Sequence, residues 1–96
     1  MTKADLISEI TEQTGVEKIA VQATVESLMT TIIDVMESGE NVYLRGFGSF
    51  VIKKRAEKTG RDISKNTTII IPEHFVPTFK PAKTFVEGVK NKIKKQ

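Results

Sequence analysis

The chain contains no cysteine and only one histidine, His74. Without cysteine it can form no disulfide, zinc–thiolate site or thiol nucleophile, and a single histidine offers too few ligands for a transition-metal centre. We therefore expect no metal, no cofactor and no enzymatic activity. No segment approaches the run of about 20 apolar residues that a membrane helix needs. The polar N-terminus lacks the apolar stretch of a secretion signal, so neither a membrane partner nor export is expected.

Positive charge is scarce in the first half of the chain and negative charge in the second. Residues 1–52 contain three Lys or Arg against eight acidic residues, a net of −5, whereas residues 53–96 contain twelve against four, a net of +8. This division favours a polyanion-binding half carried on a neutral-to-acidic body. The alternative, lysines that only solubilise a surface, leaves the clustering of the charges unexplained.

Two helices are predicted at the start of the chain. Thr2 and Asp5 have the spacing of a capping box, and apolar residues recur at helical spacing up to Gly15, a natural stop. These signals predict one helix over Lys3–Thr14. A longer apolar stripe predicts a second over Glu17–Ser38, closed by Gly39. So wide a stripe needs a partner surface that a chain of this size does not supply by itself.

Beyond Asn41 the apolar period falls from 3.6 to 2, which is typical of strands. Strands are predicted on both sides of the tight turn Gly46-Phe47-Gly48, over Thr67–Ile71, and over Phe75–Lys80. Between them, residues 53–62 have no large apolar side chain with which to pack against a body. They therefore form either a two-stranded ribbon that projects into solvent or an ordinary flexible loop. A last helix is predicted over Ala82–Lys95, with an apolar side made of Phe85, Val86, Val89 and Ile93.

Three motifs in this order resemble the bacterial HU/integration host factor family of histone-like DNA-bending proteins. They are Gly46-Phe47-Gly48-Ser49-Phe50, Arg55-Ala56-Glu57-Lys58-Thr59-Gly60-Arg61 and Val76-Pro77-Thr78-Phe79-Lys80. The resemblance runs from the start of the chain to about Lys90. It implies an α+β fold: an intertwined dimer with a helical base and a three-stranded antiparallel sheet extended into a long β-ribbon arm, plus a C-terminal helix.

The same resemblance implies a division of the chain and a function. Residues 1–96 would be one HU-like domain, with a helical dimerisation hairpin over 1–39, a sheet over 41–80 with an arm over about 53–75, and a helix with a basic tail over 81–96. The protein would be a non-enzymatic, nucleoid-associated protein of the bacterial cytoplasm. It would bind the DNA minor groove as a dimer through two arms and bend DNA with little base readout. The implied partners are double-stranded DNA, especially bent or distorted, and an identical or homologous chain, with RNA as a further ligand of the arms.

Residues of the arm, its base and the body are the expected DNA contacts, and most of them are cations. They are Lys3, Gly46, Lys53, Arg55, Lys58, Arg61, Lys65, Asn66, Lys80 and Lys83. The family carries a proline wedge at the arm tip, and here the matching position is Ile63, after Arg61-Asp62. Isoleucine also acts as a minor-groove wedge in architectural proteins. The expected dimer core comprises Leu28, Ile32, Phe47, Phe50 and Phe79.

Other functions fit the residues less well. The two N-terminal helices resemble a helix-turn-helix, but the polar face of the second is acidic and would be repelled by phosphate. Thr67–Ile71 would suit strand addition to another protein, which would be nearly insensitive to salt. His74 beside Glu73 lacks a nucleophile, and a nuclease would need a carboxylate cluster for Mg²⁺. A surface histidine at a strand end is therefore the expected role of His74.

Overall fold

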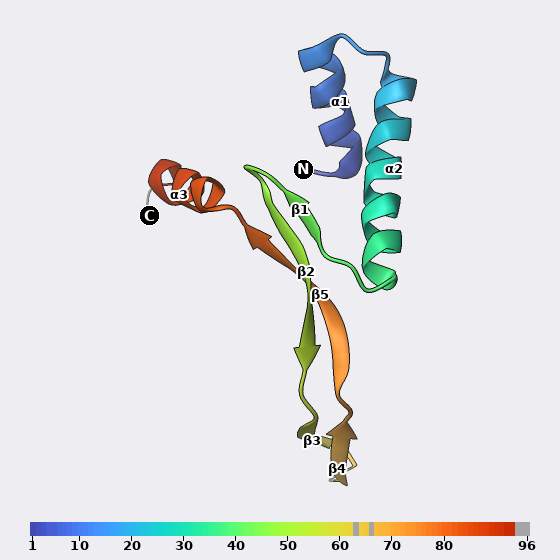
Figure 1. Cartoon of the computed structure of the whole chain (residues 1–96), viewed down its shortest axis with the longest axis vertical. Helices are drawn as coiled ribbons and strands as arrows, with labels where there is room; N and C mark the ends of the chain where they lie inside the picture. The colour runs from blue at the N-terminus through green and yellow to red at the C-terminus, as the bar shows by residue number, and fades with distance from the viewer. Residues whose placement is uncertain (63, 66, 94–96) are drawn as a thin grey trace.

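A computed structural model of the chain describes residues 1–62, 64–65 and 67–93. Two helices, α1 (Lys3–Thr14) and α2 (Lys18–Glu37), form a hairpin at one end of the molecule (Figure 1). The strands follow in chain order: β1 (Val42–Leu44), β2 (Gly48–Arg55), β3 (Lys58–Asp62), β4 (Thr67–Ile71) and β5 (His74–Pro81). The helix α3 (Lys83–Lys92) comes last. This is the α+β order expected from the sequence.

The limits of α1 are set by its caps. The Thr2 hydroxyl accepts from the Asp5 backbone N–H at 3.3 Å, and the Asp5 carboxylate accepts from the Thr2 N–H at 2.9 Å, so the predicted capping box is confirmed. Gly15 ends the helix with φ 73° and donates to the Thr11 carbonyl. A residue with a side chain would be strained at that φ. Both predicted ends of α1 are confirmed.

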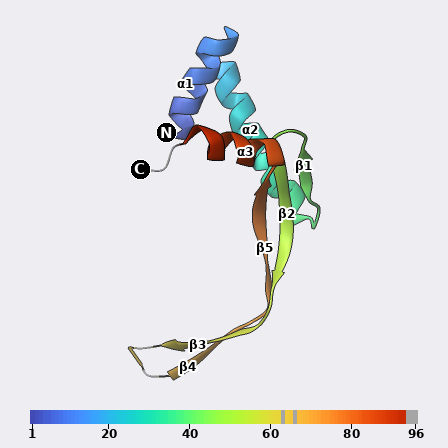
Figure 2. The same ribbon diagram turned by 90° about the vertical axis from the view of Figure 1, so that its left-hand side faces the viewer.

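The strands form two antiparallel sheets. β1, β2 and β5 make a three-stranded sheet with β2 in the middle, and β3 pairs with β4 in a two-stranded ribbon. Figure 2 shows this ribbon turning away from the long axis of β2 and β5, beyond the two short interruptions at residues 56–57 and 72–73. Residues 58–62 and 67–71 are therefore a projecting arm, as one of the two sequence alternatives predicts, and not a loop.

The helix α3 is anchored to the sheet through aromatic rings. The Phe85 ring lies 5.6 Å from that of Phe47 and 6.3 Å from that of Phe79, centroid to centroid. The predicted helix over Ala82–Lys95 is too long: Ala82 is the N-cap, the last helical residue is Lys92, and Ile93 is extended with φ −95° and ψ 112°. Ile93 therefore does not continue the apolar side of α3. No glycine stop follows, and lysines gather in the last turn, so the sequence contained no sharp end signal. Lys94 and Lys95 lie outside the described residues.

The described residues do not enclose a core of their own. Among the described residues only Ile7 and Val21 are buried apolar side chains, with 3% and 4% of their surface exposed. The radius of gyration is 18.9 Å, whereas a compact chain of this length would have about 12–13 Å. The helix α2 is also long and apolar enough to cross a bilayer by length and composition alone. Its apolar surface therefore needs a cover that lies outside this single chain.

Candidate nucleic-acid interface

The sheet and the arm share one pairing frame. Arg55 pairs with His74 at the end of the β2–β5 ladder, and Lys58 pairs with Ile71 at the start of the β3–β4 ladder. From one ladder to the next the chain advances three residues on the outgoing side, from Arg55 to Lys58, and three on the returning side, from Ile71 to His74. No bulge therefore shifts one side, or limb, of the hairpin against the other. Because side chains alternate between the faces of a strand, we use this shared register to assign each face of the arm to one face of the sheet.

One of these faces, here called the basic face, points away from α2 and holds four cations. It includes the cross-strand pairs Ser49–Lys80, Lys53–Val76, Arg55–His74 and Arg61–Thr68. Its four cations, Lys53, Arg55, Arg61 and Lys80, all come from the expected contact set and all are exposed. Cations in one line along a ribbon can neutralise successive phosphates of a duplex.

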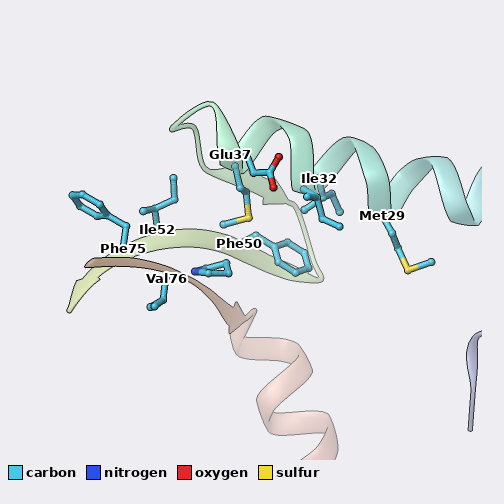
Figure 3. A pocket seen from close by; sticks show the side chains of 10 residues that line it. Met29, Ile32, Glu37, Phe50, Ile52, Phe75 and Val76 are labelled. Carbon is cyan, nitrogen blue, oxygen red and sulfur yellow. The ribbon is translucent and has the colours of Figure 1, made fainter. Parts of the chain in front are cut away.

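The opposite, apolar face turns toward α2. Phe50, Ile52, Phe75 and Pro77 line a groove of about 690 Å³ together with α2 side chains such as Met29 and Ile32 (Figure 3). Val76, the neighbour of Phe75 along β5, is also among the residues that line the groove (Figure 3). Glu37 is the only charged residue among those that line the groove. The two faces of β2 and β5 therefore differ in chemistry as well as in direction.

Two lysines lie on the apolar face. Lys54 Nζ is 3.2 Å from the Glu73 carboxylate in an exposed ion pair. Lys58, one of the expected DNA contacts, shares this face because it pairs with Ile71 in the β3–β4 ladder. The structure thus separates Lys58 from Arg55 and Arg61, which the sequence had grouped with it. The separation depends on the register across residues 56–57, which no sequence pattern specifies.

The remaining expected contacts are spread over the body and the arm tip. The Lys3 ammonium is 2.8 Å from Glu26 on α2, with both side chains about half exposed. Gly46 has φ 81° in the turn between β1 and β2, and a Cβ there would meet no atom within 4 Å, so its backbone is open to close approach. Lys83 begins α3 and Lys65 lies in the turn between β3 and β4, and both are exposed. Ile63 and Asn66 lie outside the described residues.

The expected dimer core is only partly covered in one chain. Leu28 is 53% and Phe47 is 47% exposed, whereas Ile32, Phe50 and Phe79 are half-buried. Phe79 packs between Phe47 and Phe50, with ring centroids 5.2 and 4.8 Å away. These residues come together along α2 and the apolar side of the sheet, next to the groove. They form an apolar surface that a single chain leaves partly exposed.

Sequence reasoning missed Gly48. A Cβ at this position would lie 2.6 Å from both the Lys80 carbonyl oxygen and the Phe79 ring. No residue with a side chain fits there without displacing β5, so Gly48 allows the close pairing at the base of the sheet. The glycine stands in the quoted motif beside Phe47, but only the packing shows that steric room, not turn geometry, requires it.

Charge and hydrogen bonding perturb two carboxyl groups, both on the helical hairpin. Hydrogen bonds from Thr2 lower the pKa of Asp5, and the ammonium of Lys3 together with Gln22 lowers the pKa of Glu26. His74 is the exposed first residue of β5, as expected, and its Nδ1–H donates to the Pro72 carbonyl at 2.9 Å. Across the described ranges no three His, Cys, Asp or Glu side chains gather as a metal site would require.

A basic β-ribbon arm on a helical base with an uncovered apolar face defines an architectural DNA-binding protein. Residues 1–90 match the family model described as "Bacterial DNA-binding protein", and the chain belongs to that family. It is 39% identical over 92 residues to the SPbeta prophage-derived DNA-binding protein HU 2 of Bacillus subtilis, covering 96% of this chain and 100% of the relative. It is 36% identical over 90 residues to the integration host factor subunit beta of Shewanella pealeana, covering 93% and 95%.

The fold agrees with this assignment. The chain superposes on the HU protein of an Anabaena HU–DNA cocrystal structure with a TM-score of 0.89 and 36% identity, covering 93% of this chain and 97% of that one. HU and integration host factor proteins function as dimers. The resemblance inferred from the three motifs is therefore confirmed over nearly the whole chain, and with it the family fold of helical base, sheet, arm and C-terminal helix.

Proposed function

We propose that two copies of this chain, or one copy and a homologous chain, form an intertwined dimer whose arms enter the DNA minor groove and bend the duplex. The observation that carries this proposal is the continuous basic face from Lys80 at the base of the sheet to Arg61 in the arm. Contacts of this kind bind phosphate and groove shape and read few bases. The protein acts without catalysis, at the nucleoid of a bacterial cytoplasm.

The dimer follows from the uncovered apolar surface. The α2 stripe, the groove beside it and the Phe47–Phe50–Phe79 cluster are adjacent, and a second copy offers the same surface in return. A twofold dimer pairs one surface with itself. It also places two arms on one duplex, so that the basic faces of both chains meet a common phosphate surface. In this arrangement residues 1–39 supply the helical base and residues 53–75 the arm.

The contacts differ in strength along the interface. The four cations of the basic face neutralise phosphates along the groove. Lys58 reaches a phosphate only around the edge of the arm and contributes less. Lys3, Gly46 and Lys83 on the body contact flanking DNA, whereas Lys65 and Asn66 act near the tip. The Lys3–Glu26 pair is exposed, so it opens at small cost when phosphate replaces the carboxylate.

Gel-shift titration of linear, nicked and four-way-junction DNA at two salt concentrations tests this function. Steep loss of affinity with salt, and tighter binding to the nicked and junction DNA, are the expected results. Salt-insensitive binding, or no binding to any duplex, would overturn the proposal. Binding of a protein strand by the edge of β4 is the competing function, and it would give that salt-insensitive result. A parallel titration with structured and single-stranded RNA measures whether the arms also take RNA.

Ile63 is proposed as the wedge that kinks the duplex. An Ile63→Ala change removes the apolar bulk, so it should retain dimer stability and most nonspecific affinity but lose bending and the preference for nicked DNA. End-to-end energy transfer on a short duplex with dyes at both ends measures the bend. Undiminished bending by the Ile63→Ala dimer would show that the wedge lies elsewhere.

A further inference from the structure

Three consecutive isoleucines lie exposed along β4. Ile69, Ile70 and Ile71 have 44%, 63% and 42% of their surface accessible. Their cross-strand partners on β3 are Gly60, Thr59 and Lys58. Because side chains alternate, Ile70 lies on the basic face, whereas Ile69 and Ile71 lie on the apolar face. The chain thus places an isoleucine on the same side of the arm as Arg61, and it is the most exposed of the three.

We propose that Ile70 packs against the floor of the minor groove and makes the arm discriminate against guanine. The inference rests on the proposed function, because it requires the basic face to meet DNA. In the minor groove A·T and T·A pairs present only acceptors, whereas G·C pairs add the guanine N2 amine as a donor. An isoleucine cannot accept a hydrogen bond, so a guanine beneath it would keep its bond to cytosine but leave the second N–H of the amine buried without an acceptor. Ile70 would therefore favour A·T pairs without any direct hydrogen bond to a base.

The surroundings of Ile70 identify DNA as its partner. Ile70 and Thr59 are followed on the same face by the Arg61–Thr68 pair, two residues further along each strand. Two residues of a strand span about 7 Å, and the minor groove is about 6 Å wide between its phosphate walls. An apolar side chain with a cation one such step away matches an apolar groove floor with phosphates beside it. The exposed Arg55 continues the same face toward the body.

The test uses duplexes that differ only in the minor-groove amine. Three sequences carry A·T, G·C or inosine·C pairs under the arms, and inosine differs from guanine only by the missing N2 amine. The variant is Ile70→Thr, which keeps β-branching and strand propensity and supplies a hydroxyl acceptor for the amine. The matched control is Ile71→Thr, the same change one residue away on the opposite face. Affinities are measured by competition at one fixed salt concentration.

The wild-type dimer should bind the A·T and inosine·C duplexes alike, and the G·C duplex about fivefold or more weakly, which is the lower end of the cost of one unpaired buried donor. Ile70→Thr should remove most of this difference, and Ile71→Thr should retain it. Equal wild-type affinity for G·C and inosine·C, or the same loss in both variants, would overturn the role of Ile70. The wild-type salt titration separates the two failures: steep salt dependence without amine discrimination refutes only Ile70, whereas no salt-dependent binding refutes the DNA interface itself.

Discussion

Removing one cation from the basic face should change the salt dependence of DNA binding by a calculable amount. The face carries Lys53, Arg55, Arg61 and Lys80, so the eight cations of a dimer contribute about −7 to the slope of log affinity against log salt, and the contacts of the body and tip add to it. An Arg55→Gln change removes two contacts per dimer and should make the total slope less steep by about 2. The corresponding loss of affinity is about sixtyfold at 0.1 M salt and about twentyfold at 0.2 M. The variant and the wild type should therefore converge as salt rises.

The neighbouring lysine provides a matched control. Lys54 directly precedes Arg55 on β2 but lies on the apolar face, where its Nζ is 3.2 Å from the Glu73 carboxylate. Because that pair is exposed, Lys54→Gln should alter stability little and leave the slope near that of the wild type. Lys58→Gln should fall between the two. Fluorescence anisotropy with one labelled duplex at four or five salt concentrations measures all the slopes.

Two results would refute the reasoning. Equal flattening by Arg55→Gln and Lys54→Gln would mean that the faces do not differ toward DNA. A wild-type slope that Arg55→Gln leaves unchanged would mean that this arginine neutralises no phosphate. A change in preference between sequences with an intact slope would indicate that Arg55 reads bases instead.

The other predictions concern the body of the molecule. Gly48→Ala should destabilise the fold by about 1–3 kcal/mol, because its Cβ would lie 2.6 Å from atoms of Lys80 and Phe79. Denaturant titration measures this loss. The control is Gly88→Ala, whose Cβ would meet no atom within 4 Å and which should not destabilise the fold. The melting midpoint should rise with protein concentration because folding and dimerisation are linked, and a concentration-independent midpoint with a monomeric mass by light scattering would contradict the dimer. Since the folded state lowers the pKa of Asp5 and of Glu26, their stabilising effect should be complete at neutral pH and decline below about pH 4.5. Asp5→Asn and Glu26→Gln should each make acid unfolding less steep, and an unchanged acid transition in both would refute this assignment.

Local signals predicted the helical hairpin well, most clearly for α1, where each end has its own chemical cause. Thr2, Asp5 and Gly15 set the limits of α1 without help from distant residues. The predicted limits of α2, Glu17 and Ser38, are its two capping residues. The end of α3 was missed because Lys90, Lys92 and the residues after them contain neither glycine nor proline. Where no residue forces a stop, the end of a helix depends on its packing. The ring contacts of α3 with the sheet are made by Phe85, near the start of the helix.

The site was predicted as a set of residues but not as a surface. Charge clustering proposed Lys53, Arg55, Lys58 and Arg61 as contacts from sequence, yet it could not divide them between two faces. That division requires the pairing of Lys58 with Ile71 and of Arg61 with Thr68, which only the folded ribbon fixes. The role of Gly48 was hidden for the same reason, since its constraint comes from β5, some thirty residues later in the chain. Contacts between distant segments determine these features, and periodicity contains no information about them.

The shared pairing frame of sheet and arm also restricts how such an arm can change its length during evolution. A residue inserted into one limb of the hairpin alone would displace every cross-strand pair beyond it. One residue added to each limb would restore the pairs but would turn Arg61 and Ile70 to the opposite face of the arm. Only two residues in each limb leave both pairing and direction intact. Lengthening therefore has to proceed in whole steps of four residues, a rule that insertions and deletions among related arms can be examined for. Point substitutions at the tip are under no such restriction, which allows the end of the arm to diverge while its length stays constant.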